Sequence, residues 1–117
     1  MKISVWYPFD DIEQVVLQPL RKALGANATV LHSAKAWIDI MAGGVDKGFG
    51  LRRLGELVGA KADEIMAFGD GENDRDMLLF GGIGVAMGNG KETVKAAADY
   101  VTDHIDQDGV EKALIHF

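Results

Sequence analysis

The sequence predicts an α/β protein with two parts, residues 1–42 and residues 43–117. After Gly43, short apolar strands alternate with helices, the pattern that builds a parallel sheet with crossover helices. Before Ala42, alternating apolar residues flank one amphipathic helix. The composition agrees with this class, because 48% of the 117 residues are hydrophobic and 26% are charged, as in an ordinary globular domain.

The first part is expected to run strand, helix, strand, strand. Apolar residues alternate over 3–7, which predicts a short strand. A helix is expected from Asp10 to Gly25, since acidic residues favour a helix start and glycine favours its end. Pro19 lies inside this helix and is expected to kink it, because proline removes a backbone hydrogen bond. Further strands are expected at 29–32 and 37–41.

The second part is expected to alternate helices with strands, and its periodicity and its glycines predict where each element begins and ends. The expected helices are 47–58, 73–80, 91–98 and 109–116, and the expected strands are 65–68, 83–86 and 100–102.

Charge and composition exclude several classes of protein. The formal net charge of −6 opposes binding to the phosphate backbone of a nucleic acid. The absence of cysteine excludes a disulfide framework and a thiolate metal site. No apolar run approaches the roughly 18 residues of a membrane span, and the N-terminal apolar stretch is too short for a signal peptide. We therefore expect a cytoplasmic protein that binds neither nucleic acid nor membrane.

Two carboxylates follow the strand expected at 65–68. Asp70 and Asp74 lie in a glycine-flanked loop at the carboxyl end of that strand, where an open α/β sheet binds ligands. Their hard oxygen atoms suit Mg²⁺. The alternative is local, because Asp70 could close an Asx turn and Asn73 or Asp74 could cap the next helix.

Lys47 stands at the start of a predicted helix, where the helix dipole disfavours a cation. An anion near its side chain would compensate, although a solvated lysine is the simpler reading of a single residue. The loop at 86–90 joins a strand to a helix at the same edge of the sheet, and it offers backbone N–H groups and the amide of Asn89.

Three stretches together resemble the C-terminal half of a Cof-type phosphatase of the haloacid dehalogenase superfamily with a type IIB cap. The resemblance extends from Trp37 to Phe117, about two-thirds of the chain. The stretches are GVDKG at 44–48, FGDGENDRDML at 68–78, and GVAMGN at 84–89, which leads on to KAAADYVT at 95–102.

The resemblance implies a role for each matching residue. Lys47 would bind the transferring phosphoryl group, Asp70 would be a Mg²⁺ ligand and Asp74 would support the metal site. Asn73 and Asn89 would position the substrate phosphate. The substrate would be a phosphorylated small molecule: a sugar phosphate, a nucleotide or a cofactor phosphate. Residues 1–42 would be a remnant of the α+β cap domain, and 43–117 the C-terminal half of a Rossmann-like core.

The nucleophile of this family is not found in the sequence. It is an aspartate in an Asp-x-Asp-Gly motif directly after a buried strand, and the nearest match, at 106–109, follows polar residues instead. We therefore expect a Mg²⁺-dependent phosphatase portion that is inactive alone, the alternative being a non-catalytic anion-binding or assembly module. The strand at 65–68 would lack its neighbour, so we also expect self-association or pairing with a missing N-terminal half.

Overall fold

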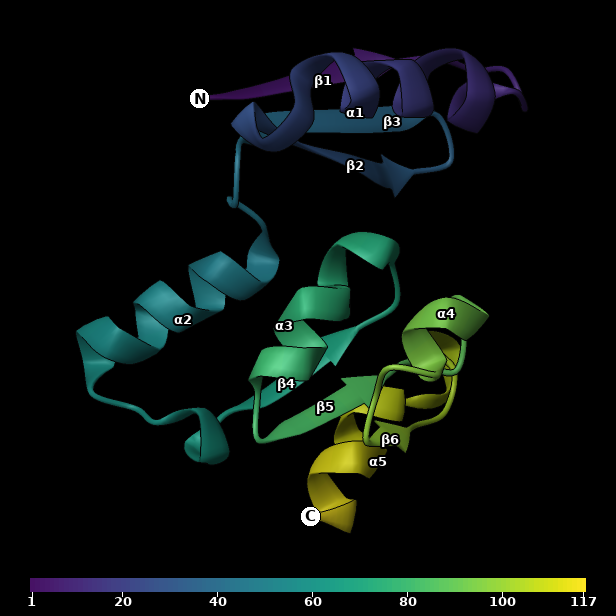
Figure 1. Ribbon diagram of the computed structural model, residues 1–117. Coiled ribbons are helices and arrows are strands. Elements are labelled where there is room, and N and C mark those ends of the chain that lie inside the picture. The colour runs from purple at the N-terminus through teal and green to yellow at the C-terminus, as the bar shows by residue number, and fades with distance from the viewer. The chain divides into compact units, whose positions relative to one another are not determined.

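The computed structural model describes all residues 1–117 and divides them into two compact units, Met1–Asp46 and Lys47–Phe117 (Figure 1). The division lies a few residues after the expected boundary at 42. The fold is α/β, as predicted. No helix has the length and apolar character needed to cross a membrane.

The first unit is a three-stranded antiparallel sheet with a helical segment across one face (Figure 1). The strand order is β1-β3-β2, so β3 is central. The buried side chains of Leu17 and Ile38 form the centre of its core. The strands are β1 (Lys2–Trp6), β2 (Ala28–Ala34) and β3 (Trp37–Ala42), and the helical segment comprises η1 (Glu13–Leu17), α1 (Gln18–Leu24) and η2 (Gly25–Asn27).

Pro19 lies where the helical segment changes its winding. The turn before it, Glu13–Leu17, is a π-helix, and the N–H of Gln18 still donates to the carbonyl of Glu13. From Gln18 onward the helix is α-helical, with Pro19 in its first turn, where its missing N–H costs little. The chain thus accommodates the proline by a wider turn.

The face of this sheet opposite the helical segment carries a buried carboxylate. Asp39 accepts hydrogen bonds from Ser4 Oγ at 2.7 Å and from Lys2 Nζ at 2.8 Å. Trp6 and Trp37 are paired directly across β1 and β3 and remain about half exposed. The carboxylate is therefore held by side chains of its own sheet.

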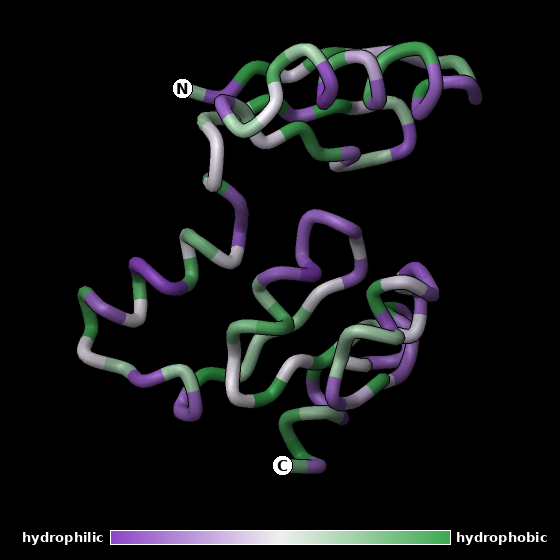
Figure 2. Tube along the Cα trace, viewed as in Figure 1, coloured by the Kyte–Doolittle hydropathy of each residue, from purple (hydrophilic) through white to green (hydrophobic).

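The second unit is a parallel sheet with the strand order β4-β5-β6, so β4 is an edge strand. Its core contains Leu78, Val85 and Val94. The loop between β4 and α3 is one of the hydrophilic stretches that Figure 2 shows in this unit. The strands are β4 (Met66–Gly69), β5 (Ile83–Ala86) and β6 (Tyr100–Val101), and the helices are α2 (Lys47–Val58), η3 (Ala62–Glu64), η4 (Glu72–Asp74), α3 (Arg75–Phe80), α4 (Glu92–Lys95), η5 (Ile105–Gln107) and α5 (Gly109–His116).

The expected helix at 91–98 is shorter than predicted. It ends at Lys95, and the next residues form tighter turns. The cause is a pair of contacts to β5, because the N–H of Asp99 donates to the carbonyl of Gly84 at 2.9 Å and the Asp99 carboxylate accepts from the Gly84 N–H at 2.8 Å. These bonds draw the chain out of the helix and into β6.

Candidate functional site

The loops after β4 and β5 lie together at the carboxyl edge of the parallel sheet. The N–H of Met87 donates to the carbonyl of Gly69 at 2.9 Å, and the N–H of Lys91 donates to the carbonyl of Asp70 at 3.0 Å. Both strands end at this edge because they are parallel. The acidic loop and the loop of Asn89 are therefore joined by their backbones.

Asp74 is the buried centre of the site, with 5% of its surface exposed. Its Oδ2 accepts from the N–H groups of Asp70 and Gly71, each at 3.0 Å, and its Oδ1 accepts from Lys47 Nζ. Burial raises the pKa of Asp74, but the hydrogen bonds from Lys47, Gly71 and Asp70 outweigh it and hold the pKa below its usual value. The carboxylate is therefore ionised, and its hydrogen bonds fix its orientation.

The loop can close around Asp74 because of Gly69. A Cβ at position 69 would collide with the Cβ of Asp74, so only glycine fits there. The N–H of Asp74 also donates to the carbonyl of Gly71 at 2.9 Å, which completes the turn of η4. The local alternative, in which the Asp74 side chain caps the next helix, is wrong: Asp74 precedes α3 without a side-chain cap hydrogen bond, and its carboxylate accepts from the loop before it and from Lys47 instead.

Lys47 reaches the site from the first turn of α2. Gly48 beside it packs against the backbone of Asp76 in α3, where a Cβ would lie 2.8 Å from the carbonyl carbon. The anion expected near Lys47 is the Asp74 carboxylate. The lysine side chain is 50% exposed, and an ammonium has three donors, so it retains donors for a further anion.

Asp70 presents an exposed carboxylate beside this ion pair. Its Oδ2 accepts from Asn89 Nδ2 at 3.3 Å. The other end of the same amide, Asn89 Oδ1, accepts from the N–H of Ile105 at 3.0 Å. Asn89 therefore links the acidic loop to the C-terminal segment.

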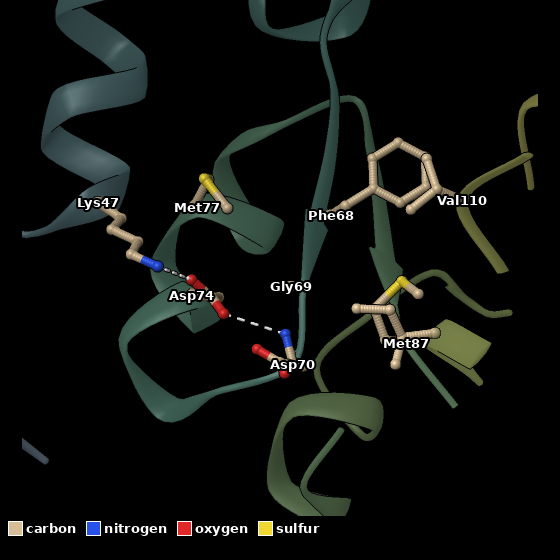
Figure 3. Close-up of a pocket in the computed structure, with 9 residues that line it drawn as sticks. Lys47, Phe68, Gly69, Asp70, Asp74, Met77, Met87 and Val110 are labelled. Atoms are coloured by element: carbon tan, nitrogen blue, oxygen red, sulfur yellow. Dashed lines mark hydrogen bonds and ion pairs between the residues drawn. The ribbon is translucent and has the colours of Figure 1, made fainter. Parts of the chain in front are cut away.

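An open hollow of about 360 Å³ lies over these residues. In Figure 3, Lys47 and Asp70 approach Asp74 from opposite sides. The hollow thus has a charged end and an apolar wall. Its lining residues are Lys47, Phe68, Gly69, Asp70, Asp74, Met77, Met87, Ile105 and Val110.

The donor set fits a weakly held Mg²⁺ ion. No cluster of three or more metal-ligating side chains is present in the structure. Asp74 already accepts three hydrogen bonds, whereas Asp70 is exposed and accepts one, from Asn89. Mg²⁺ is often held by one or two carboxylates and keeps several of its waters, so Asp70 is the residue suited to hold it directly.

The structure brings three of the five predicted site residues, Lys47, Asp70 and Asp74, into the lining of one hollow. Asn73 and Asn89 are not part of that lining. The Asn73 amide oxygen lies over Gly71, 2.7 Å from the position of a Cβ there, and Asn89 contacts Asp70.

Sequence reasoning missed the apolar wall of the hollow. Phe68 and Met87 lie within the quoted motifs, so membership of a motif was a signal for both. Ile105 and Val110 carried no such signal, because only folding brings the C-terminal segment to the hollow. The nearest match to a nucleophile motif lies close by, yet its carboxylates, Asp106 and Asp108, are exposed and do not line it.

Comparison with known proteins identifies a family and several similar proteins. The family of haloacid dehalogenase-like hydrolases matches residues 1–114. The 5-amino-6-(5-phospho-D-ribitylamino)uracil phosphatase of Bacillus subtilis is 40% identical over 108 residues, which are 92% of this chain and 43% of that protein.

Solved structures agree. A phosphatase of the same superfamily from Bacteroides thetaiotaomicron has a TM-score of 0.81 at 36% identity, covering 98% of this chain and 41% of its own. A subclass IIB sugar phosphatase has a TM-score of 0.84 at 37% identity, covering 100% and 43%. The chain thus spans less than half the length of each of these proteins.

Proposed function

The chain belongs to the haloacid dehalogenase-like hydrolases, in a branch of phosphatases, and from that membership we propose that residues 43–117 supply the phosphate-binding and Mg²⁺-binding half of a phosphomonoester hydrolase site. The observation that carries the proposal is the arrangement of Lys47, Asp74 and Asp70 along the charged end of one hollow. Residues 1–42 are, in this proposal, a remnant of the cap domain.

Each residue has a distinct part in the proposed site. Lys47 donates to the oxygens of the phosphoryl group with the N–H donors that Asp74 leaves free. Asp74 orients the ammonium, and Asp70 holds Mg²⁺. The ion, when bound, neutralises charge on the phosphoryl oxygens. These groups act by electrostatic stabilisation of an anion.

None of these 117 residues is proposed as the nucleophile that attacks phosphorus. Two carboxylates line the hollow. That of Asp74 already accepts hydrogen bonds from its own loop, and that of Asp70 is proposed to hold the metal. Covalent phosphoryl transfer needs a nucleophile in line with the leaving oxygen. We therefore place it on a segment outside the chain, and expect the chain by itself to bind phosphate without hydrolysing its esters.

The proposed substrates are phosphorylated small molecules. The relatives named above act on a phosphoribityl compound and on sugar phosphates, according to their names. A phosphorylated polyol or sugar is therefore the first class to test, and nucleotides and cofactor phosphates follow. The apolar wall of Phe68, Met87 and Val110 would face the part of the ligand beyond the phosphate.

The test is a titration with inorganic phosphate, with and without Mg²⁺, followed by ³¹P NMR. Lys47→Ala should weaken phosphate binding about tenfold or more, the value of a hydrogen bond to a charged group. Asp70→Asn should abolish the strengthening by Mg²⁺. Lys61→Ala removes a lysine outside the hollow and is the matched control. Equal phosphate affinity in both lysine variants would contradict the proposal.

A second measurement separates a hydrolase portion from an anion-binding module. Sequencing the DNA upstream of Met1 shows whether an in-frame strand ends in Asp-x-Asp-Gly. If it does, the chain is part of an enzyme with its own nucleophile. If it does not, and phosphate still binds through Lys47, the alternative of a non-catalytic module is favoured.

A further inference from the structure

Asn89 is an exposed side chain that uses both ends of its amide to join two segments. Its Nδ2 donates to the Asp70 carboxylate at 3.3 Å, and its Oδ1 accepts from the N–H of Ile105 at 3.0 Å. The three residues are far apart in sequence, on the loop after β4, the loop after β5 and the start of η5. The link is therefore a product of the tertiary structure.

The backbone of Ile105 determines which way the amide points. A backbone N–H can only donate, so the amide atom facing it must be the oxygen. The NH₂ group is then turned toward Asp70, where a carboxylate can only accept. With the opposite orientation, two donors would meet at Ile105 and two acceptors would meet at Asp70.

The segment that carries Ile105 is itself held against the loop of Asn89. The N–H of Gly88 donates to the carbonyl of Asp103 at 3.1 Å. The buried hydroxyl of Thr102 donates to the carbonyl of Gly109 at 2.6 Å, which closes the segment at its base. A Cβ at Gly88 would lie 2.7 Å from the N–H nitrogen of His104, so the two loops are in close contact. The anchor for Asn89 is therefore well defined.

We propose that Asn89 is a positioning residue that holds the Asp70 carboxylate in one orientation on behalf of the C-terminal segment, so that the metal affinity of Asp70 depends on the backbone N–H of Ile105. The inference rests on the proposed role of Asp70 as a metal ligand. Asn89 acts through Asp70, by removing orientations of the carboxylate that do not face the hollow. Groups behind a metal ligand commonly change metal affinity 10–100-fold.

The test measures binding of Mn²⁺ to the whole chain by the EPR signal of the free ion, since Mn²⁺ takes the same oxygen ligands as Mg²⁺. Asn89→Ala removes the amide, and Ile105→Pro removes the anchoring N–H while it keeps the Asn89 amide. Proline suits position 105, because His104 before it has ψ of 151° and Ile105 begins a short helix. Ile105→Val keeps the N–H and is the matched control.

We expect Asn89→Ala to weaken Mn²⁺ binding about tenfold, the lower end of the usual range because the bond is long and exposed. Ile105→Pro should weaken it in the same direction, Ile105→Val should leave it unchanged, and the double variant Asn89→Ala with Ile105→Pro should bind like Asn89→Ala alone. Thermal unfolding midpoints should hardly change, since these contacts lie at the surface.

Asp70→Asn distinguishes the role of Asp70 as a metal ligand from the role of Asn89 as its positioning residue. If Asp70→Asn abolishes Mn²⁺ binding while Asn89→Ala and Ile105→Pro bind as the unaltered chain does, the positioning role is wrong and the metal site stands. If Asp70→Asn binds Mn²⁺ normally, Asp70 is not the ligand, and the proposed metal site falls together with this inference.

Discussion

Lys47 and Asp74 lie 27 residues apart in the chain and form an ion pair in which the carboxylate is buried and the ammonium is half exposed. The buried partner is fixed by two backbone N–H groups, so the exposed partner is the one free to meet a ligand. This asymmetry makes Lys47 suited to bind an anion, with Asp74 as its support.

Asp74→Asn should destabilise residues 47–117 and weaken phosphate binding together. The amide cannot accept at both ends, so Lys47 or the N–H groups of Asp70 and Gly71 lose their acceptor, at a cost of about 2 kcal/mol. Chemical denaturation and phosphate titration measure the two effects. Asp76→Asn, at an exposed neighbour, should change stability by less than about 0.5 kcal/mol. Equal losses in both variants would contradict the role given to Asp74.

The free energy of unfolding should fall as the pH decreases below about 4. Burial raises the pKa of Asp74, but its hydrogen bonds, first that from Lys47, leave it lowered. A pKa that is lower in the folded state contributes stability above the unfolded pKa, and this contribution is lost as the pH falls through the folded pKa. Denaturation at several pH values measures it.

Burial raises the pKa of Asp39, but hydrogen bonds from Lys2, Ser4 and Ser33 outweigh it and leave the pKa lowered. Asp74→Asn and Asp39→Asn should each flatten the acid limb of the stability profile. A profile with an unchanged acid limb in both variants would show that neither carboxylate is coupled to folding.

Two glycines of α2 should respond to alanine in opposite directions. At Gly48 a Cβ would press on the backbone of Asp76, so Gly48→Ala should push α2 from α3 and lower both stability and phosphate affinity. At Gly50 nothing lies within 4 Å, so Gly50→Ala should stabilise the helix by about 0.5–1 kcal/mol. Thermal unfolding followed by circular dichroism compares them. Stabilisation by both would mean that α2 and α3 are not closely packed.

The isolated chain should show no meaningful phosphatase activity with an aryl phosphate and Mg²⁺. Turnover should stay well below about 1 s⁻¹, an ordinary enzymatic rate, because no attacking group lines the hollow. Release of the phenolate measures it. Turnover near that rate that disappears in Asp70→Ala would contradict the expectation, and its loss in Asp108→Ala would identify the exposed turn as the nucleophile.

The chain should self-associate through β4. This strand is at the edge of its sheet, and an edge strand is a template for pairing with another strand. Light scattering at micromolar concentration should give a mass above the 12.6 kDa of one chain. Met66→Lys places a charge on the edge and should reduce the mass, whereas Leu57→Lys, on an exposed face of α2, should not. A monomer in the unaltered chain would refute the expectation.

Local signals in the sequence were sufficient for most of the elements. The expected elements at 47–58, 83–86 and 109–116 match α2, β5 and α5, because helical periodicity, a buried apolar run and a flanking glycine act within a few residues. Gly59 illustrates this, since its positive φ of 75° ends α2 where the sequence predicts. The helix at 91–98 was predicted too long because a distant strand competes for the chain at Asp99.

By itself, the sequence determined the α/β class, the family and the placement of Asp70 and Asp74 on one loop after a strand, since these depend on residue order and spacing. Only the tertiary structure decided that Asp74 faces Lys47, that Asp70 faces Asn89, and that Ile105 and Val110 complete the hollow. The physical reason is that such contacts depend on how α2 packs on α3 and where the C-terminal segment returns. Packing of this kind is set by side chains that are distant in sequence, so no local pattern encodes it.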